Sequence, residues 1–597
     1  DGSYSSGITT TSGNITLVGE GSTAGVQLNN DSTITSASGN VEIDGRGTTG
    51  AGVRLVSSSA VNAGSGTVVL RAGNDGNSDA IVLAGSITST TAVNLRPLDE
   101  TDTILLGAGN GFSVGNSDLA NIHSPWLVIG SAQQQGAIQV IDALVYDSNL
   151  TLQNQGGSAG IYLGAGVDVG LHTLGLLTGG SITQDADAAI HAESLLAIAA
   201  GDVLLATAQN DVAGTTLSGS AGGVYEFLDV NALAIGNVNA FGFDANGNVL
   251  AGQAGSGISA GGNVFVQTLS GNLTMNANVN GVDVDLVTAG VFLNPAGATI
   301  NASGDWRIWA STWLGEDRGG LAGNGSLPNL YNCTYGGPCG VTVGSGSHFI
   351  YTQQPTLSIW IDNASREYGD ANPAFNYSAS GLILGDTLAN VLMGYLSSAA
   401  NSGSDVGQYA INGNFVSPAG YAIAFVPGTG LLTITPATLL FTADPLLWYM
   451  GVPFPAFTGT ITGFKNGDTA ASVFGNNPYW FTNASPLSMP GFYAIYGGGN
   501  AQNYVFTQAS SNQSALHLIP AAVTSDQPTT FVSERNDTDV YDTNIGQVEM
   551  CPVSDSGNDQ ALEGGDALGG DWSKVRKRLN LLNCFSNDKK GGCSGSF

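Results

Sequence analysis

The first half of the chain consists of short runs in which apolar residues recur two positions apart, each run bounded by Gly or Asn. Residues 12–17 (SGNITL) return at 38–43 (SGNVEI) and at 65–70 (SGTVVL). A second motif alternates with the first, at 25–28 (GVQL), 52–55 (GVRL) and 80–83 (AIVL). Alternation with period two predicts half-buried strands, and Gly and Asn favour the tight turns between them.

Two or three short strands in each period of about 25 to 28 residues are typical of one coil of a solenoid. We therefore expect a right-handed parallel β-helix, in which inward side chains stack on their equivalents in the next coil. Looser copies at 149–152, 160–163, 263–266 and 272–275 extend this stalk. We place it at residues 1–352, and Trp306, Trp309 and Trp313 are expected to cover its last coil. A globular sandwich with coincidental Gly-Asn turns is the alternative.

A different and longer repeat follows the stalk. Five short matches recur in the same order about 82 positions apart; they are 373–375 with 455–457, 385–387 with 467–469, 408–411 with 492–495, Tyr421 with Tyr504, and 432–436 with 516–520. Short alternating strands with Pro and Gly turns predict a small β-sandwich or β-grasp module in each copy. We place the two modules at residues 353–436 and 437–520.

Composition agrees with an all-β protein and sets limits on its ligands. The 597 residues include 87 Gly, only 10% are charged, and the formal net charge is −31. Such an acidic body repels phosphate backbones, so nucleic acid is not expected as a partner. No run of about 18 uninterrupted apolar residues occurs, which argues against a membrane-spanning helix.

Five cysteines fall into two close pairs and a single residue, Cys551. Cys333 lies six positions before Cys339, and Cys584 nine before Cys593. With so few histidines and no CxxC spacing, two local disulfides in an oxidising compartment are favoured over a zinc site. The state of Cys551 is left open.

The C-terminal region changes character. Residues 521–570 are polar and weakly patterned, which is typical of a linker. Residues 571–597 contain the one convincing helical pattern, followed by the Cys584–Cys593 loop. Its apolar face would carry Trp572, Val575, Leu579 and Leu582, and its basic residues are Lys574, Arg576, Lys577 and Arg578.

The repeats resemble a known family. The segment 366–373 (REYGDANP), with Gly385-Asp386-Thr387 and 432–436 (LTITP), is similar to the MBG repeats of large bacterial surface proteins. The second copy departs from this pattern at 449–455 (YMGVPFP). The preceding solenoid resembles filamentous-haemagglutinin-like exoproteins of two-partner secretion systems. Such exoproteins begin with a secretion domain bearing an Asn-Pro-Asn-type motif, which is not visible here, so we expect this chain to be the C-terminal portion of a longer one.

The tail resembles the cysteine hook of two-partner-secretion adhesins. That resemblance implies a C-terminus held in, or on the periplasmic side of, an outer-membrane transporter barrel, with the rest of the protein displayed at the cell surface. The basic residues would then contact an acidic pore lining or anionic lipid. An ordinary stabilising disulfide at a frayed terminus is the alternative.

No catalytic or cofactor-binding pattern is found. The stalk has no Lys before Lys465, its few Arg are scattered, and the five His share no motif, so the acid and base groups of a polysaccharide-cleaving β-helix are not assembled. Residues 244–248 (DANGN) resemble part of a calcium loop but lack its remaining ligands, and a β-turn is favoured. We expect no metal, no cofactor and no enzymatic activity.

These patterns predict a non-enzymatic adhesin or biofilm matrix protein that is displayed extracellularly. Its ligand would be a host-surface or matrix component, and a carbohydrate suits its aromatic surfaces. A self-associating filament or sheath subunit is the main alternative, and a polysaccharide-cleaving enzyme is a distant one.

Overall fold

The computed structural model describes residues 6–75, 78–475 and 478–521. Within it, residues 7–351 form a parallel β-helix and residues 356–519 form two small β modules, as predicted. The linker 521–570, apart from its first residue, the basic helix 571–597 and the Cys584–Cys593 disulfide are predictions that lie outside the described residues. Among the described residues no helix has the length and apolar character needed to cross a bilayer.

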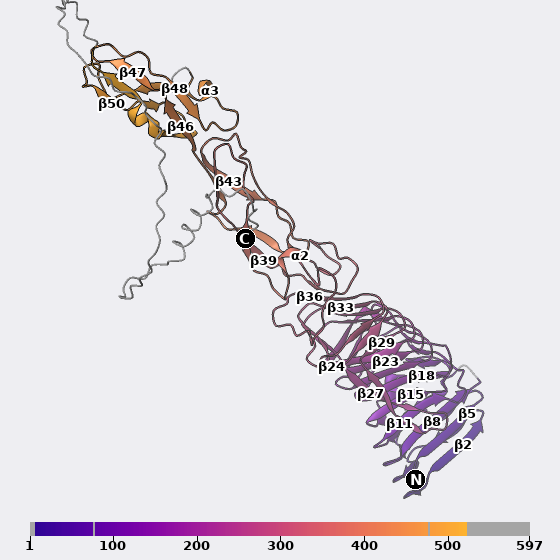
Figure 1. Ribbon diagram of the computed structural model, residues 1–597. Helices are drawn as coiled ribbons and strands as arrows, with labels where there is room; N and C mark the ends of the chain where they lie inside the picture. The colour runs from indigo at the N-terminus through magenta and orange to yellow at the C-terminus, as the bar shows by residue number, and fades with distance from the viewer. Residues whose placement is uncertain (1–5, 76–77, 476–477, 522–597) are drawn as a thin grey trace, which may run out of the picture. The chain divides into compact units, whose positions relative to one another are not determined.

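Each coil contributes strands to three faces, and the strands of one face pair in parallel with those of neighbouring coils (Figure 1). One face begins with β1 (Gly7–Thr10), β4 (Thr33–Ser36), β7 (Ala60–Asn62), β10 (Ser86–Thr88) and β14 (Ile122–His123). Later short strands pair in the same way: β17 (Leu144–Val145) with β20 (Val167–Asp168), and β26 (Leu233–Ile235) with β31 (Leu273–Met275) and β34 (Phe292–Leu293). The ladder of β29 (Ile258–Ala260), β32 (Val279–Gly281) and β35 (Ile300–Ala302) instead continues the second face, from residues 219–221.

A second face contains β2 (Ile15–Gly21), β5 (Val41–Gly47), β8 (Thr67–Asn74), β11 (Ala92–Pro97), β15 (Trp126–Ser131), β18 (Asn149–Asn154), β21 (Thr173–Thr178), β23 (Ile190–Ala199) and β24 (Val203–Ala221). The long strands β23 and β24 continue around a corner, and β24 pairs on both the second and the third face. We call this second face the strap face, for the hairpin described below.

The third face begins with β3 (Ala24–Leu28), β6 (Ala51–Leu55) and β9 (Ile81–Leu83), followed by β12 (Ile104–Leu106), β13 (Phe112–Val114), β16 (Ile138–Val140), β19 (Ile161–Leu163) and β22 (Ile182–Gln184). It ends with β25 (Tyr225–Asp229), β30 (Val264–Thr268), β33 (Val284–Thr288), β36 (Trp306–Ala310), β37 (Asn329–Tyr331) and β38 (His348–Tyr351). The short helix α1 (Asn116–Leu119) lies between β13 and β14.

The core consists of inward apolar residues stacked from coil to coil. The register places Ile15 beside Val41 and Val41 beside Val68, the same residues that the sequence repeat aligns. Val41 and Val68 are fully buried, as are most of their equivalents further along the ladder. Burial of such aliphatic side chains contributes about 1.5–3 kcal/mol for each residue, so the repeat itself supplies the cohesion of the solenoid.

A hairpin that the repeat does not predict crosses the outside of the strap face. It consists of β27 (Asn237–Phe243) and β28 (Val249–Ser256), inserted into one coil. Phe243 packs with Val69 and Val128 of earlier coils, whereas Val238 and Ala240 pack with residues of later ones. We call this hairpin the strap, because its contacts span several coils.

The tip of the strap is the 244–248 segment. Asp244 accepts hydrogen bonds from the backbone N–H groups of Asn246 and Asn248, which makes this segment a β-turn. The buried Arg96 guanidinium donates to the carbonyl oxygens of Asp244 and Ala245 at 2.7 and 2.8 Å. The carboxylate oxygens of Asp244 thus accept hydrogen bonds within the turn, and Arg96 fixes the turn to the solenoid.

The modules are built from small sheets, two in the first module and three in the second. The first contains β39 (Thr356–Ile361), β40 (Ala364–Glu367), β41 (Tyr377–Ser380), α2 (Leu388–Val391), β42 (Leu396–Ser398), β43 (Gly407–Gly413), β44 (Ala422–Phe425) and β45 (Leu431–Thr435). The second contains β46 (Ala437–Ala443), β47 (Leu446–Tyr449), β48 (Gly459–Thr462), α3 (Ala470–Phe474), β49 (Tyr479–Phe481), β50 (Gly491–Tyr493), β51 (Tyr496–Gly498), β52 (Tyr504–Gln508), the 3₁₀ turn η1 (Ser510–Ser514) and β53 (Leu516–Ile519).

The modules share the same hydrogen-bonded joint. In the first module Asp386 accepts from the phenol of Tyr421 at 2.7 Å and from that of Tyr331, on the last coil, at 2.8 Å. The same arrangement recurs one repeat later, around Asp468 of the second module. Each Gly-Asp-Thr aspartate therefore links its own module to the unit that precedes it.

Candidate functional site

The end of the third face is overlaid by a loop that creates a groove. Strands β30, β33 and β36 are paired in register, which sets Gln267, Val287 and Trp309 side by side on the outside of the coils. The segment between β37 and β38 then returns over this surface. Sheet faces of a solenoid are otherwise flat, so the loop turns a surface into a recess.

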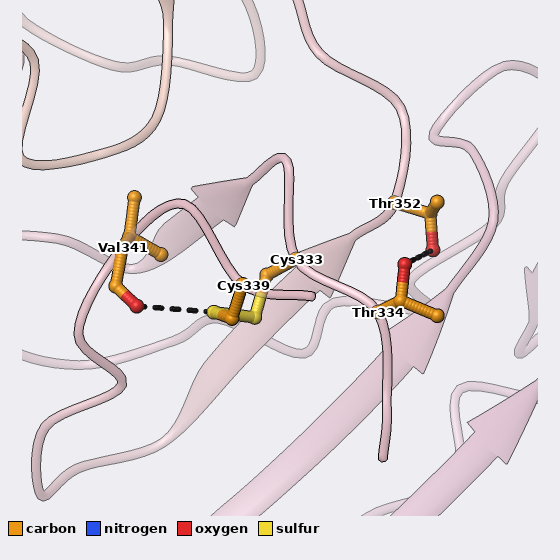
Figure 2. The surroundings of a disulfide bond; sticks show 5 residues. All are labelled: Cys333, Thr334, Cys339, Val341 and Thr352. Atoms are coloured by element: carbon orange, nitrogen blue, oxygen red, sulfur yellow. Dashed lines mark hydrogen bonds between the residues drawn. A yellow bond between two sulfur atoms is a disulfide. The ribbon is translucent and has the colours of Figure 1, made fainter. Parts of the chain in front are cut away.

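A disulfide holds that loop. Cys333 is bonded to Cys339, six residues on (Figure 2). Cys333 also donates its backbone N–H to the carbonyl oxygen of Tyr351 on β38. The hydroxyl of Thr334 donates to that of Thr352 at 3.2 Å, and Cys339 Sγ lies 3.0 Å from the carbonyl oxygen of Val341 (Figure 2). These contacts fix the loop at both ends, and the disulfide is the one that the cysteine spacing predicts.

The loop places an aromatic ring between two rings of the sheet. Tyr335 stacks on Phe265 with ring centroids 5.6 Å apart, and it meets Trp309 edge-to-face at 5.3 Å. Tyr335 is 39% exposed, so part of its ring faces solvent. Aromatic groups held in this way present rigid apolar surface at low entropic cost.

The recess between loop and sheet has a volume of about 160 Å³. Its wall combines the polar residues Gln267, Thr268, Thr288, Ser311, Thr334 and Thr352 with the aromatic residues Trp309 and Tyr335 and with apolar residues such as Val287. Sites for drug-sized ligands usually occupy about 300–1,000 Å³, so this one suits a single small ring or one residue of a polymer.

The groove is bordered by acidic groups. Burial raises the pKa of Asp285, opposed by the indole N–H of Trp309, which donates to its carboxylate at 3.3 Å. Burial also raises the pKa of Tyr335, and the nearby Asp285 and Glu226 raise it further. Tyr335 is therefore a neutral phenol at physiological pH, able both to donate and to accept a hydrogen bond.

Of the three tryptophans predicted to cover the last coil, only Trp313 contacts the last two strands from outside the ladder. Trp306 and Trp309 lie on β36, which pairs with β33 on one side and with β38 on the other, so the prediction is wrong for these two residues. Trp313 packs edge-to-face on Tyr331 and Tyr351 of the last two strands. The end of the ladder is covered instead by the first module, through the Asp386 joint.

The sequence does not single out Phe265 or Tyr335 as a site residue. It singles out Trp309 only as a residue expected to cover the last coil. Phe265 and Trp309 are two coils apart, and only the strand register shows that they are neighbours. Tyr335 is signalled by its place between the two cysteines. Across the described ranges, no group of three or more His, Cys, Asp and Glu side chains is arranged to hold a metal ion.

Comparison with known proteins identifies the two modules. The MBG domain (YGX type) matches residues 357–433 and 439–513. No curated protein and no solved structure matches the chain at the threshold of significance. The chain thus carries two MBG domains after a β-helix, the organisation of an adhesin-like repeat protein.

Proposed function

We propose that this chain is part of a non-enzymatic adhesin or matrix protein displayed at the bacterial surface, and that its disulfide-closed groove binds a carbohydrate. The observation that carries the proposal is the Phe265–Tyr335–Trp309 aromatic cluster beside a recess of about 160 Å³ lined with hydroxyl and amide groups. Sugar rings have apolar C–H faces that pack on aromatic rings and hydroxyls that pair with such polar groups.

The architecture of the chain also supports the adhesin proposal. A β-helix supplies length at a constant cross-section, because each coil adds one strand spacing of about 4.8 Å. The MBG domains continue the chain in two further units. A binding site on such a scaffold is held away from the point of attachment, which is what an adhesin requires.

The test of the ligand is a glycan array followed by titration of the full chain. We expect at least one class of glycan to bind, and Trp309→Ala and Tyr335→Ala to raise its Kd tenfold or more. Tyr162→Ala is the matched control, because Tyr162 is another partly exposed aromatic residue of the third face, hydrogen-bonded to Asp185. Absence of any glycan binding, or equal binding by all three variants, would refute the carbohydrate proposal.

We further propose export by a two-partner system and retention through the Cys584–Cys593 loop in the transporter pore. A closed loop is bulkier than an extended chain and resists passage through a pore of limited width. The expected result for Cys584→Ser and Cys593→Ser is release of the protein into the medium with unchanged export. Retention equal to that of the natural protein would remove the anchor from the model without affecting the groove.

Self-association is the second candidate function. It is favoured by one observation, an exposed apolar surface on the second MBG domain, which the groove does not explain.

A further inference from the structure

The second MBG domain carries a row of large side chains across the outside of one sheet. Strand β53 lies between β47 and β50, and the register aligns Leu447, His517 and Phe492 across the three strands. The rings of Phe492 and His517 stack at 4.2 Å with an interplanar angle of 16°. Leu447 and Phe492 are 60% and 65% exposed.

The first MBG domain has polar residues at the same positions. Its strands β40, β45 and β43 have the same register, which aligns Ser365, Thr433 and Gln408 in the corresponding row. One position further along the same face, Tyr449 replaces Glu367. Because both domains have the same fold, the apolar row is not required by the fold of the second one.

Adjacent loops enlarge this surface. The backbone N–H of Gly451 donates to Pro486 at 2.7 Å, which joins the turn after β47 to the loop before β50. Val452 on the turn and Leu487 and Met489 on the loop are exposed, the last two at 81%. We call the six exposed apolar residues of this region the module-2 face: Leu447, Tyr449, Val452, Leu487, Met489 and Phe492.

Charge favours contact at this place over the more acidic parts of the described chain. The second module has three charged residues, Asp444, Lys465 and Asp468, whereas the whole chain has a net charge of −31. Asp468 is taken up by the joint, and Lys465 pairs with Asp370 of the first module at 2.9 Å. Two copies of the chain therefore repel least where their second modules meet.

We propose that the module-2 face is a self-association surface, on which a second copy of this chain docks through the same face by a two-fold axis. Six apolar side chains exposed to this degree present on the order of 700 Å², close to the ~800 Å² that each partner contributes to an interface of standard size. A two-fold contact is self-complementary, so one patch is sufficient and the assembly closes as a dimer. Exposed apolar surface of this extent marks interaction sites in soluble proteins.

The inference does not depend on the carbohydrate proposal. If both hold, a dimer presents two grooves, and binding to a multivalent surface is strengthened by the high effective concentration of the second site. Substitutions in the groove leave the dimer intact, and substitutions in the module-2 face leave binding to a single glycan intact. The two proposals can therefore fail separately.

The experiment is sedimentation velocity on the full chain between about 1 and 100 µM. We expect a monomer–dimer equilibrium, and expect the double variant Leu447→Ser with Phe492→Gln to raise the dissociation constant at least tenfold. These substitutions introduce the residues that the first MBG domain has at the same positions, so the fold tolerates them. Leu171→Ser is the matched control, because Leu171 is a leucine of similar exposure (70%, against 60% for Leu447) on the solenoid.

Salt dependence gives a second measurement. Raising sodium chloride from 50 to 500 mM screens the repulsion between the acidic bodies, so the dimer should become tighter. Three results would overturn the proposal: a monomer throughout the concentration range, a dimer that survives the double variant unchanged, or open polymers that grow beyond the dimer with concentration.

Discussion

The phenol of Tyr368 lies 3.0 Å from the Asp468 carboxylate, and this contact joins the two MBG domains. Asp468 also accepts from Tyr504 of its own domain at 2.7 Å, and the two tyrosine rings meet edge-to-face at 5.4 Å. Tyr331 and Tyr421 meet in the same way at 5.0 Å around Asp386. The chain therefore uses one joint twice, first between solenoid and module and then between modules.

Removal of the joint acceptor should destabilise the second module. Asp468→Ala leaves two largely buried phenols without their charged partner, and we expect the free energy of unfolding of this module to fall by about 2–4 kcal/mol. Urea denaturation followed by tyrosine and tryptophan fluorescence measures the loss. Asp444→Ala is the control, because Asp444 accepts from the exposed Thr458. An equal loss of unfolding free energy in the two variants would show that the joint stabilises the module no more than an exposed hydrogen bond does.

The joints should open in alkali. Burial, together with the adjacent aspartates, raises the pKa of Tyr421 and Tyr504 to about 12. In the unfolded chain tyrosine ionises near pH 10, so the folded state favours the neutral phenols and their contribution is complete below that pH. It is lost as pH rises from about 10 to 12. Stability measured across this range should fall steeply in the natural protein and less steeply in Tyr504→Phe; parallel curves would contradict the assignment.

Loss of Arg96 should release the strap. Arg96→Met keeps an apolar stem but removes both hydrogen bonds to the turn carbonyls, a loss of about 2–3 kcal/mol in local stability. Amide hydrogen exchange in β27 and β28 is then expected to become 10- to 100-fold faster, with the solenoid core unchanged. Arg54→Met, at an exposed position of β6, should leave exchange as it is. Unaltered protection of the strap in Arg96→Met would show that packing alone holds it.

Reduction of the Cys333–Cys339 disulfide should impair the groove and spare the solenoid. In the chain-entropy model, closing so short a loop contributes about 2 kcal/mol, and the loop carries Tyr335. With dithiothreitol, or in Cys333→Ser with Cys339→Ser, we expect glycan affinity to fall at least tenfold with an unchanged β circular dichroism spectrum. The double variant should not respond further to reductant at this site. Full affinity after reduction would mean that Tyr335 is positioned by the sheet.

Much of the solenoid and the modules follows from the sequence alone, because a repeat fixes which residues are equivalent. Ile15 and Val41 occupy the same place in the motif and lie side by side in the ladder. The repeat likewise relates Asp386 to Asp468, 82 positions later, and Tyr421 to Tyr504, 83 positions later. The partnership between these aspartates and tyrosines is not visible in the repeat, since it arises from the packing of one unit on the next.

The groove and the strap could not be predicted because each breaks the repeat. Tyr335 lies in an excursion, and its position over Phe265 depends on how the disulfide loop folds back. The strap is a pair of antiparallel strands within a parallel ladder, and its alternation resembles one more coil. The helices α2 and α3, which each follow a Gly-Asp-Thr motif, are only four and five residues long and have no detectable helical period. Features made by contacts between coils require the three-dimensional register.

The strap has a consequence for mechanical load. A solenoid in which each coil contacts only its neighbours can be peeled from a free end, one coil at a time, at a low and nearly constant force. The strap ties Val69 and Val128 to a segment more than one hundred positions later in the chain. Peeling from the N-terminal side must therefore break the strap's contacts with several coils together. In a tether under flow, extension should stop at this point until the force rises, so the strapped coils set a force threshold for further unfolding.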